Sequence, residues 1–189
     1  MQQTTSDLQL FERLRQGESQ ALDALFRQYY ADCCRSAERI LRDPAAAEDV
    51  VQELFLNLWK KRNTLPQIDE PRAYLLRSAR NRSLNWLRDR SKMPQTDGEL
   101  PDIPTAANQP TSQLELNELQ ARVDAAIDSL PERCRLVYVL CRLEEMPRDE
   151  VAQKLGISVK TVENQMTRAY KFLRQYLSVA LLLTPTIWP

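Results

Sequence analysis

The clearest pattern in the sequence is a run of apolar residues spaced three and four apart between positions 44 and 60. Its members are Ala47, Val50, Val51, Leu54, Phe55 and Leu58. This spacing places them along one side of an α-helix, so the sequence predicts an amphipathic helix whose stripe faces a core. Asp43 and Pro44 come directly before the run, and both residue types favour the start of a helix.

Helical periods also predict helices on both sides of this one. They are expected at about 6–16, 19–41 and 70–92, then from Ser112, from Ser129 and from Pro147 to Gly156, and last from Ser158 to about Leu177. No segment alternates apolar and polar residues long enough to indicate a strand. The predicted fold class is therefore all-α.

A change of composition separates two helical halves. Residues 93–113 contain four Pro and one Gly but no Lys or Arg, which is typical of a linker. A flexible coil of that length averages roughly 25 Å from end to end. We expect two small helical domains, 1–92 and 112–178, joined by a flexible, acidic, Pro-rich linker at 93–111 and followed by an apolar tail at 179–189.

The composition argues against an enzyme. The chain has no His, no Gly-rich phosphate loop and no cluster of metal ligands, so we expect no catalytic residues, cofactor or metal. Its four Cys do not have a zinc spacing and are expected to be reduced thiols. No signal peptide opens the sequence, and the longest apolar stretch is too short to cross a bilayer. We therefore expect a cytoplasmic protein with no membrane insertion.

The formal net charge is zero, but the charges are not evenly spread. Residues 70–92 have a net charge of +5 and residues 154–174 have +4, while 93–120 contain five acids and no base. One basic helix in each domain is what a protein that contacts phosphates at two places needs. Two solvated helix faces that happen to be rich in Arg would give the same pattern.

Residues 147–174 fit a helix-turn-helix. The small Ala152 allows a close helix crossing, and Gly156 allows a left-handed turn between the helices. Apolar residues at 151, 155, 157 and 162 fill the corner. The fold class is thus two helical domains of which the second is a helix-turn-helix domain, winged-helix-like, of three or four helices.

The second helix of this motif presents polar residues that can read base edges or contact phosphates in a major groove. They are Lys160, Thr161, Glu163, Asn164, Thr167, Arg168 and Lys171. Repressors, response regulators and sigma factors all contain such a motif, so the motif alone does not name a function.

Three further segments give the chain a family resemblance: 43–59, 71–88 and 130–138. With the helix-turn-helix, they make it resemble the extracytoplasmic-function (ECF) group of bacterial sigma factors over about residues 6–177. The chain departs from the family's pattern at Glu145 and Met146, where Gly is common. The resemblance implies an RNA polymerase sigma factor that directs promoter-specific initiation, with core RNA polymerase and promoter DNA as partners. It also implies an anti-sigma factor, which is membrane-bound in one version of this hypothesis.

The helix at 43–59 resembles the family's helix that docks on the polymerase clamp. The residues opposite its apolar stripe are Asp49, Gln52, Glu53 and Leu56. An exposed Leu among polar residues fits an apolar anchor with a polar rim. A solvated helix with one stray Leu is the alternative.

The helix at 71–88 resembles the one that melts and reads the minus-ten element, and residues 62–69 resemble the loop that holds a flipped base. The residues expected to contact this DNA are Arg62, Asn63, Arg77, Arg80, Asn81, Arg82, Asn85, Trp86 and Arg88. Aromatic and amide side chains among Arg suit unstacked bases. Tyr74 and Trp86 can equally belong to the core. The competing function is a stand-alone regulator that binds DNA as a dimer through the helix-turn-helix.

Overall fold

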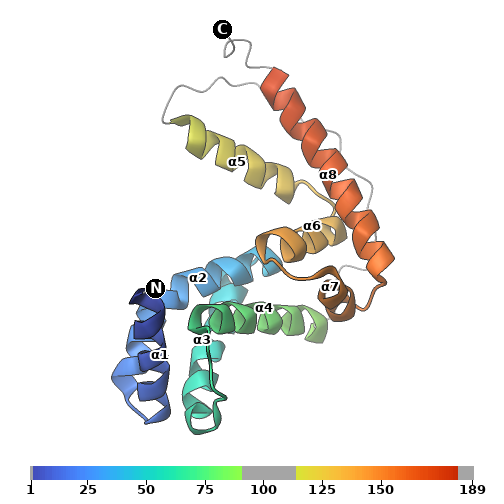
Figure 1. Cartoon of the computed structure of the whole chain (residues 1–189). Coiled ribbons are helices and arrows are strands. Elements are labelled where there is room, and N and C mark those ends of the chain that lie inside the picture. Colours follow the sequence, from blue (N-terminus) through green and yellow to red (C-terminus); the bar gives the residue numbers. More distant parts are fainter. Residues whose placement is uncertain (1, 91–113, 183–189) are drawn as a thin grey trace. The chain divides into compact units, whose positions relative to one another are not determined.

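The computed structural model describes residues 2–90 and 114–182, and every regular element in these ranges is a helix (Figure 1). The chain divides into two compact units, Met1–Met93 and Pro94–Pro189. The predicted all-α class with two helical domains is confirmed. The predicted linker and its neighbour Ser112 lie outside the described residues.

The first unit consists of α1 (Gln2–Arg15), α2 (Ser19–Leu41), α3 (Pro44–Lys60), the short 3₁₀ turn η1 (Arg62–Thr64) and α4 (Pro71–Asp89). The long helix α2 packs against α1, α3 and α4, so it is the centre of this unit (Figure 1). The apolar stripe predicted on α3 is buried at every position, from Ala47 to Leu58. Asp43 caps α3, because its Oδ1 accepts a hydrogen bond of 3.1 Å from the backbone N–H of Ala46.

The second unit consists of α5 (Leu114–Asp128), α6 (Glu132–Tyr138), the π-helical turn η2 (Val139–Leu143), α7 (Arg148–Leu155) and α8 (Val159–Leu182). Helices α5, α6 and α7 all pack against α8. Its buried side includes Val162, Met166, Ala169 and Phe172, which follow the helical period.

The predicted turn between α7 and α8 is confirmed. Gly156 has a φ of 65°, in the left-handed region where L side chains are strained. The backbone N–H of Thr161 donates a 3.0 Å hydrogen bond to the hydroxyl of Ser158, so Ser158 caps α8 as expected. Val151 and Val162 are fully buried in the corner between the two helices, while Leu155 and Ile157 are half-buried.

Some predicted helix ends were wrong. The first helix begins at Gln2 rather than near residue 6, and the last continues to Leu182 instead of ending near Leu177. Neither extension contains Gly or Pro, so nothing in the local sequence stops helical hydrogen bonding there. Pro147 is the N-cap residue of α7, and the helix itself begins at Arg148.

Candidate polymerase and nucleic-acid interfaces

The four residues predicted to meet polymerase lie together on the outer side of α3. Asp49, Gln52, Glu53 and Leu56 are all exposed, and the side opposite them is the buried stripe. Leu56 is 57% exposed, the largest value among the exposed large hydrophobic residues of the described chain. An apolar side chain in this position loses contact with water only if another molecule covers it.

Helix α2 extends this apolar surface with two residues, Phe26 and Tyr30, that the sequence pattern did not predict to lie there. Phe26 is 37% exposed and stacks on Tyr30 with ring centroids 4.4 Å apart. Phe26 also meets the edge of Phe55 on α3, with centroids 5.1 Å apart. These contacts place an aromatic pair of α2 beside the exposed side of α3. The i, i+4 spacing of Phe26 and Tyr30 was the available signal.

Helix α4 presents most of the predicted minus-ten residues, although not all on one side. At 100° per residue, Arg77, Asn81, Asn85 and Arg88 share a side that lies away from the buried Leu75, Ala79 and Ser83. Three of the four are exposed, whereas Asn81 is half-buried and its Oδ1 is enclosed. Arg88 donates a 2.8 Å hydrogen bond from Nη2 to Oδ1 of Asn85, which joins two members of this side.

The other α4 residues occupy its flanks or the core. Arg80, Arg82 and Trp86 are half-buried, and the guanidinium of Arg90 lies 4.5 Å from the ring centroid of Trp86. Tyr74 is half-buried with its ring 6.1 Å from that of Phe11 on α1, so it belongs partly to the core of the unit.

Two α4 cations face acids of neighbouring helices. Arg82 Nη1 lies 3.8 Å from Glu53 Oε2 on α3, and Arg72 Nη2 lies 3.6 Å from Asp32 Oδ2 on α2. The first pair joins the predicted polymerase surface to the predicted DNA helix. Ion pairs this exposed contribute only about 0–1 kcal/mol each, so they can exchange partners easily.

Arg62 is half-buried and packs against Trp59 near the end of α3. Its Nη1 donates a 2.9 Å hydrogen bond to the carbonyl oxygen of Trp59, and its guanidinium lies 4.3 Å from the Trp59 ring centroid. These contacts make it a residue that positions the loop. The neighbouring Asn63 is exposed.

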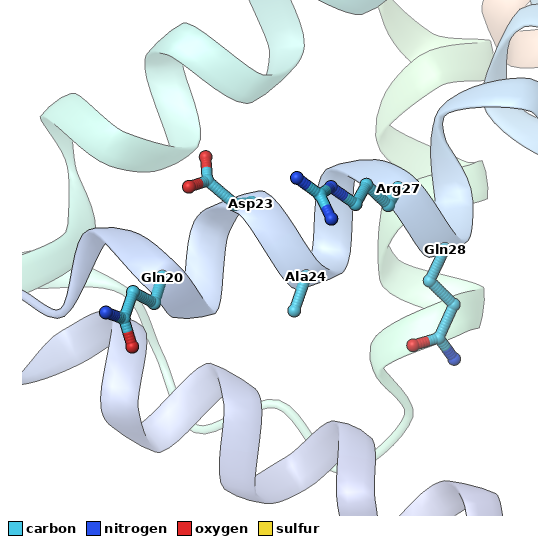
Figure 2. Close-up of a pocket in the computed structure, with 5 residues that line it drawn as sticks. All are labelled: Gln20, Asp23, Ala24, Arg27 and Gln28. Carbon is cyan, nitrogen blue, oxygen red and sulfur yellow. The ribbon is translucent and has the colours of Figure 1, made fainter.

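Two of the hollows in the described part of the first unit have linings that bear on function. One of about 340 Å³ lies between α1 and the loop before α4, lined by Leu8, Phe11, Glu12 and Arg15 together with residues 66–69. The other, of about 570 Å³, follows α2 and is lined by Gln20, Asp23, Ala24, Arg27 and Gln28 (Figure 2). The side chains that line this second hollow come from successive turns of α2 and include one acid and one base. They do not form a group of catalytic residues.

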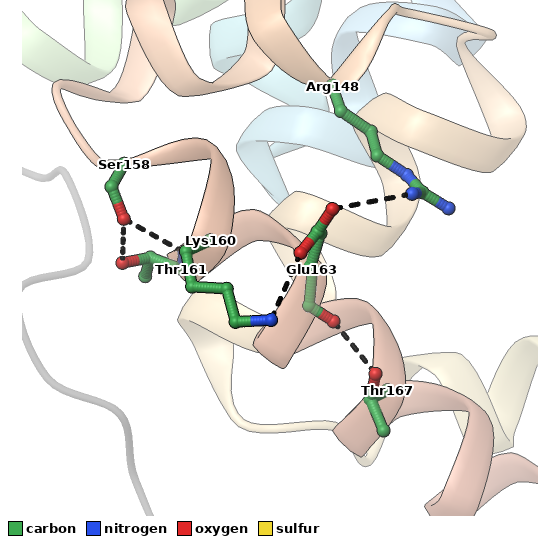
Figure 3. A network of polar contacts seen from close by, with 6 residues as sticks. All are labelled: Arg148, Ser158, Lys160, Thr161, Glu163 and Thr167. Carbon is green, nitrogen blue, oxygen red and sulfur yellow. Dashed lines mark hydrogen bonds and ion pairs between the residues drawn. The ribbon is translucent and has the colours of Figure 1, made fainter.

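The predicted minus-thirty-five residues lie on the side of α8 that faces away from its core. Lys160, Asn164, Thr167 and Lys171 are exposed, while Thr161, Glu163 and Arg168 are half-buried. Figure 3 shows that polar contacts order the first turns of this side. The Thr161 and Ser158 hydroxyls are 2.9 Å apart, Lys160 Nζ lies 3.3 Å from Glu163 Oε2, and Thr167 Oγ1 donates a 2.9 Å hydrogen bond to the Glu163 carbonyl oxygen.

The cysteine thiols show no sign of unusual reactivity. All four Cys are free thiols: Cys33 and Cys134 are buried and the other two half-buried. Burial raises the pKa of Cys34 and of Cys141 above the ordinary thiol value, which keeps both protonated near neutral pH. Within residues 2–90 and 114–182, no group of three or more Cys, Asp or Glu side chains could hold a metal ion, and no helix could cross a membrane.

Comparison with known proteins matches both units to one family. The model for sigma-70 region 2 matches residues 25–93, and that for sigma-70 region 4 matches residues 120–173. The ECF RNA polymerase sigma factor SigE of Mycolicibacterium smegmatis is 30% identical over 82% of this chain, but the match covers only 61% of SigE. The RNA polymerase sigma-H factor of Pseudomonas aeruginosa is 27% identical over 86% of this chain and 89% of its own length.

A solved structure agrees with these matches. The structure of CnrH in complex with the cytosolic domain of CnrY is 25% identical in sequence and has a TM-score of 0.50. The likeness covers 91% of this chain and 97% of CnrH. The two matched segments are regions 2 and 4 of one family, and the second contains the helix-turn-helix. The chain belongs to the sigma-70 family of RNA polymerase sigma factors, in its ECF group.

Proposed function

We propose that this protein is a non-enzymatic initiation factor that binds core RNA polymerase and directs it to a set of promoters. The observation that supports this best is the presence, in two separate units, of an outward-facing polar and basic helix side. Residues 1–92 are then the domain that binds the clamp and the minus-ten element. Residues 112–178 are the domain that reads the minus-thirty-five element, and the acidic segment 93–111 links them.

Docking on polymerase is assigned to the exposed side of α3 together with Phe26 and Tyr30 of α2. Leu56 and Phe26 supply apolar surface, and Asp49 and Glu53 supply a negatively charged rim. A partner helix with apolar and basic side chains complements such a surface.

Minus-ten recognition is assigned to α4. Arg77 and Arg88 are placed to contact phosphates, and Asn85 on the same side has an exposed amide that can pair with a base edge. Asn81 borders this side, half-buried with its Oδ1 enclosed, so its contact with DNA would be made through the amide NH₂. Arg80, Arg82 and Trp86 flank this side, and Asn63 belongs to the loop before it. Arg62 supports that loop through Trp59.

Minus-thirty-five recognition is assigned to the first turns of α8. Asn164 can read adenine, Glu163 can accept a hydrogen bond from a base amino group, and Lys or Arg can read guanine or contact phosphate. Lys160, Thr161, Thr167, Arg168 and Lys171 complete this side of the helix.

A protein inhibitor of the anti-sigma type is the proposed regulator, acting in the cytoplasm where polymerase is found. The support is a likeness: the related CnrH was solved in complex with the cytosolic domain of CnrY. The exposed apolar side chains of α2 and α3 are where such an inhibitor would compete with polymerase.

The experiment is transcription from a library of promoter-sized DNA fragments by core polymerase, with and without the full-length protein. Start sites that depend on the protein and share two elements about two helical turns apart are expected. If no fragment responds, but the protein alone binds a defined duplex as a dimer, the stand-alone regulator is correct and the assignment of α3 to polymerase is abandoned.

A further inference from the structure

One acid in the predicted DNA surface of the second unit lies between two cations from different helices. Glu163 on α8 has Oε2 3.3 Å from Nζ of Lys160 and Oε1 4.0 Å from Nη1 of Arg148 (Figure 3). Arg148 is the first residue of α7, so the contact joins the two helices of the helix-turn-helix. Arg148 is not among the residues that the sequence pattern predicted to contact DNA.

Both ion pairs are open to solvent. The side chains of Lys160, Arg148 and Glu163 are 78%, 54% and 42% exposed. Exposed pairs contribute about 0–1 kcal/mol, so a DNA phosphate can replace the carboxylate as the partner of either cation. The pairs are therefore weak enough to open when DNA binds.

Arg148 lies where it can contact a phosphate of the DNA backbone. In a helix-turn-helix the first helix crosses the DNA backbone while the second enters the major groove. Arg148 begins the first helix and reaches the α8 surface through Glu163. The next two residues, Asp149 and Glu150, are acidic. Positive potential at this place therefore comes from Arg148 and Lys160, whose charges Glu163 partly neutralises.

We propose that Glu163 is a positioning residue that couples base reading to phosphate binding. On DNA of arbitrary sequence the carboxylate stays with Arg148 and Lys160 and reduces their attraction for phosphates. On a site with a base amino group opposite Glu163, the carboxylate accepts that hydrogen bond, and the two cations turn to the backbone. Arg148 is thus a further DNA-binding residue, available mainly on the correct sequence. This inference rests on the proposed function of the second unit.

The first test uses the full-length protein and a 30-base-pair duplex of random sequence, with fluorescence anisotropy at 50–200 mM salt. Glu163→Gln keeps the side-chain shape and removes the charge. We expect it to bind this duplex roughly threefold to tenfold more tightly at the lowest salt, with a log–log salt slope steeper by about one to two. Glu132→Gln removes the same charge from an exposed position on α6 and is expected to change the affinity less.

A double-mutant cycle then isolates Arg148. Arg148→Ala is expected to have little effect in the wild-type chain but to remove much of the gain in the Glu163→Gln chain. Lys154→Ala, an exposed cation on another side of α7, is the matched control and should have the same small effect in both chains.

The second test uses holoenzyme and a promoter identified by the transcription library. Glu163→Gln should reduce the ratio of promoter to random-sequence affinity, and Arg148→Ala should weaken promoter binding more than random binding. The proposal is overturned if Glu163→Gln binds random DNA as the wild type does, or if Glu132→Gln gives an equal gain. It is also overturned if Arg148→Ala is additive with Glu163→Gln. Failure of the proposed function appears differently, as a wild-type protein that activates no promoter.

Discussion

Truncation of Leu56 to Ala is the most direct test of the polymerase-binding surface proposed on α3. The side chain is 57% exposed, so slightly more than half of its apolar surface remains to be buried by a partner. Complete burial of a Leu side chain is worth about 1.5–3 kcal/mol. The exposed part, less what Ala retains, corresponds to about 1 kcal/mol, or roughly a fivefold loss of affinity for core polymerase.

The assay is titration of fluorescently labelled full-length protein with core polymerase, accompanied by thermal unfolding of the free variant. The free protein should unfold at nearly the same temperature as the wild type, because most of the removed surface faces water. Leu8→Ala is the matched control, since Leu8 is 39% exposed but belongs to α1, outside the proposed surface. Equal affinities for wild type and Leu56→Ala, or an equal loss with Leu8→Ala, would refute the assignment of α3 to polymerase.

Three further predictions concern stability and are measured by denaturant or thermal unfolding. Glu145→Gly should stabilise the second unit by about 0.5–1 kcal/mol, because Glu145 has a φ of 52° that only Gly adopts without strain, whereas Glu145→Ala should give no such gain. Gln165→Met should be neutral or stabilising by about 1 kcal/mol, because Gln165 is 1% exposed and within the described chain its Oε1 has no hydrogen-bond partner. A clear loss of stability would contradict this and indicate that Oε1 does have a hydrogen-bond partner. Tyr29→Phe should destabilise the first unit by about 1–3 kcal/mol near neutral pH, because it removes the hydroxyl that donates to the buried Asp7.

Tyr29 also predicts how the first unit responds to alkali. Burial, followed by the neighbouring Asp7, raises the pKa of Tyr29 well above its ordinary value of 10.0. The folded state therefore has its full advantage below about pH 10 and loses it as the pH rises further, because the unfolded chain releases the proton first. The Tyr29→Phe variant should lack this part of the alkaline loss of stability, and a variant that loses stability as steeply as the wild type would contradict the assignment.

The sequence was sufficient to predict the helices because each one has a local signal. The apolar stripe of α3, the Asp43 and Ser158 caps and the left-handed Gly156 all depend on neighbours within a few residues, and all are present in the structure. The ends of α1 and α8 were wrong because no residue there stops a helix. In such segments the boundary depends on weak propensities rather than on one residue.

The residues of the interfaces were harder to predict, because their orientation depends on contacts between helices. Periodicity alone placed Leu56 on the outer side of α3, but it could not show that Phe26 and Tyr30 of α2 lie beside it. Arg62 was expected to contact DNA, whereas its guanidinium packs on the ring of Trp59 and donates to the Trp59 carbonyl oxygen. Arg148 was missed because its relation to Glu163 exists only once α7 and α8 pack together.

These contacts reconcile the equal numbers of acidic and basic residues in the chain with the two DNA-binding surfaces proposed for it. Arg82 faces Glu53, and Arg148 with Lys160 faces Glu163, so three cations of the proposed surfaces already have acidic neighbours. Each such pair lowers the attraction for phosphates in general but is too weak to prevent exchange with a well-placed one. The isolated protein should therefore bind DNA weakly, and strong binding should require polymerase to hold both units over matching promoter elements at once.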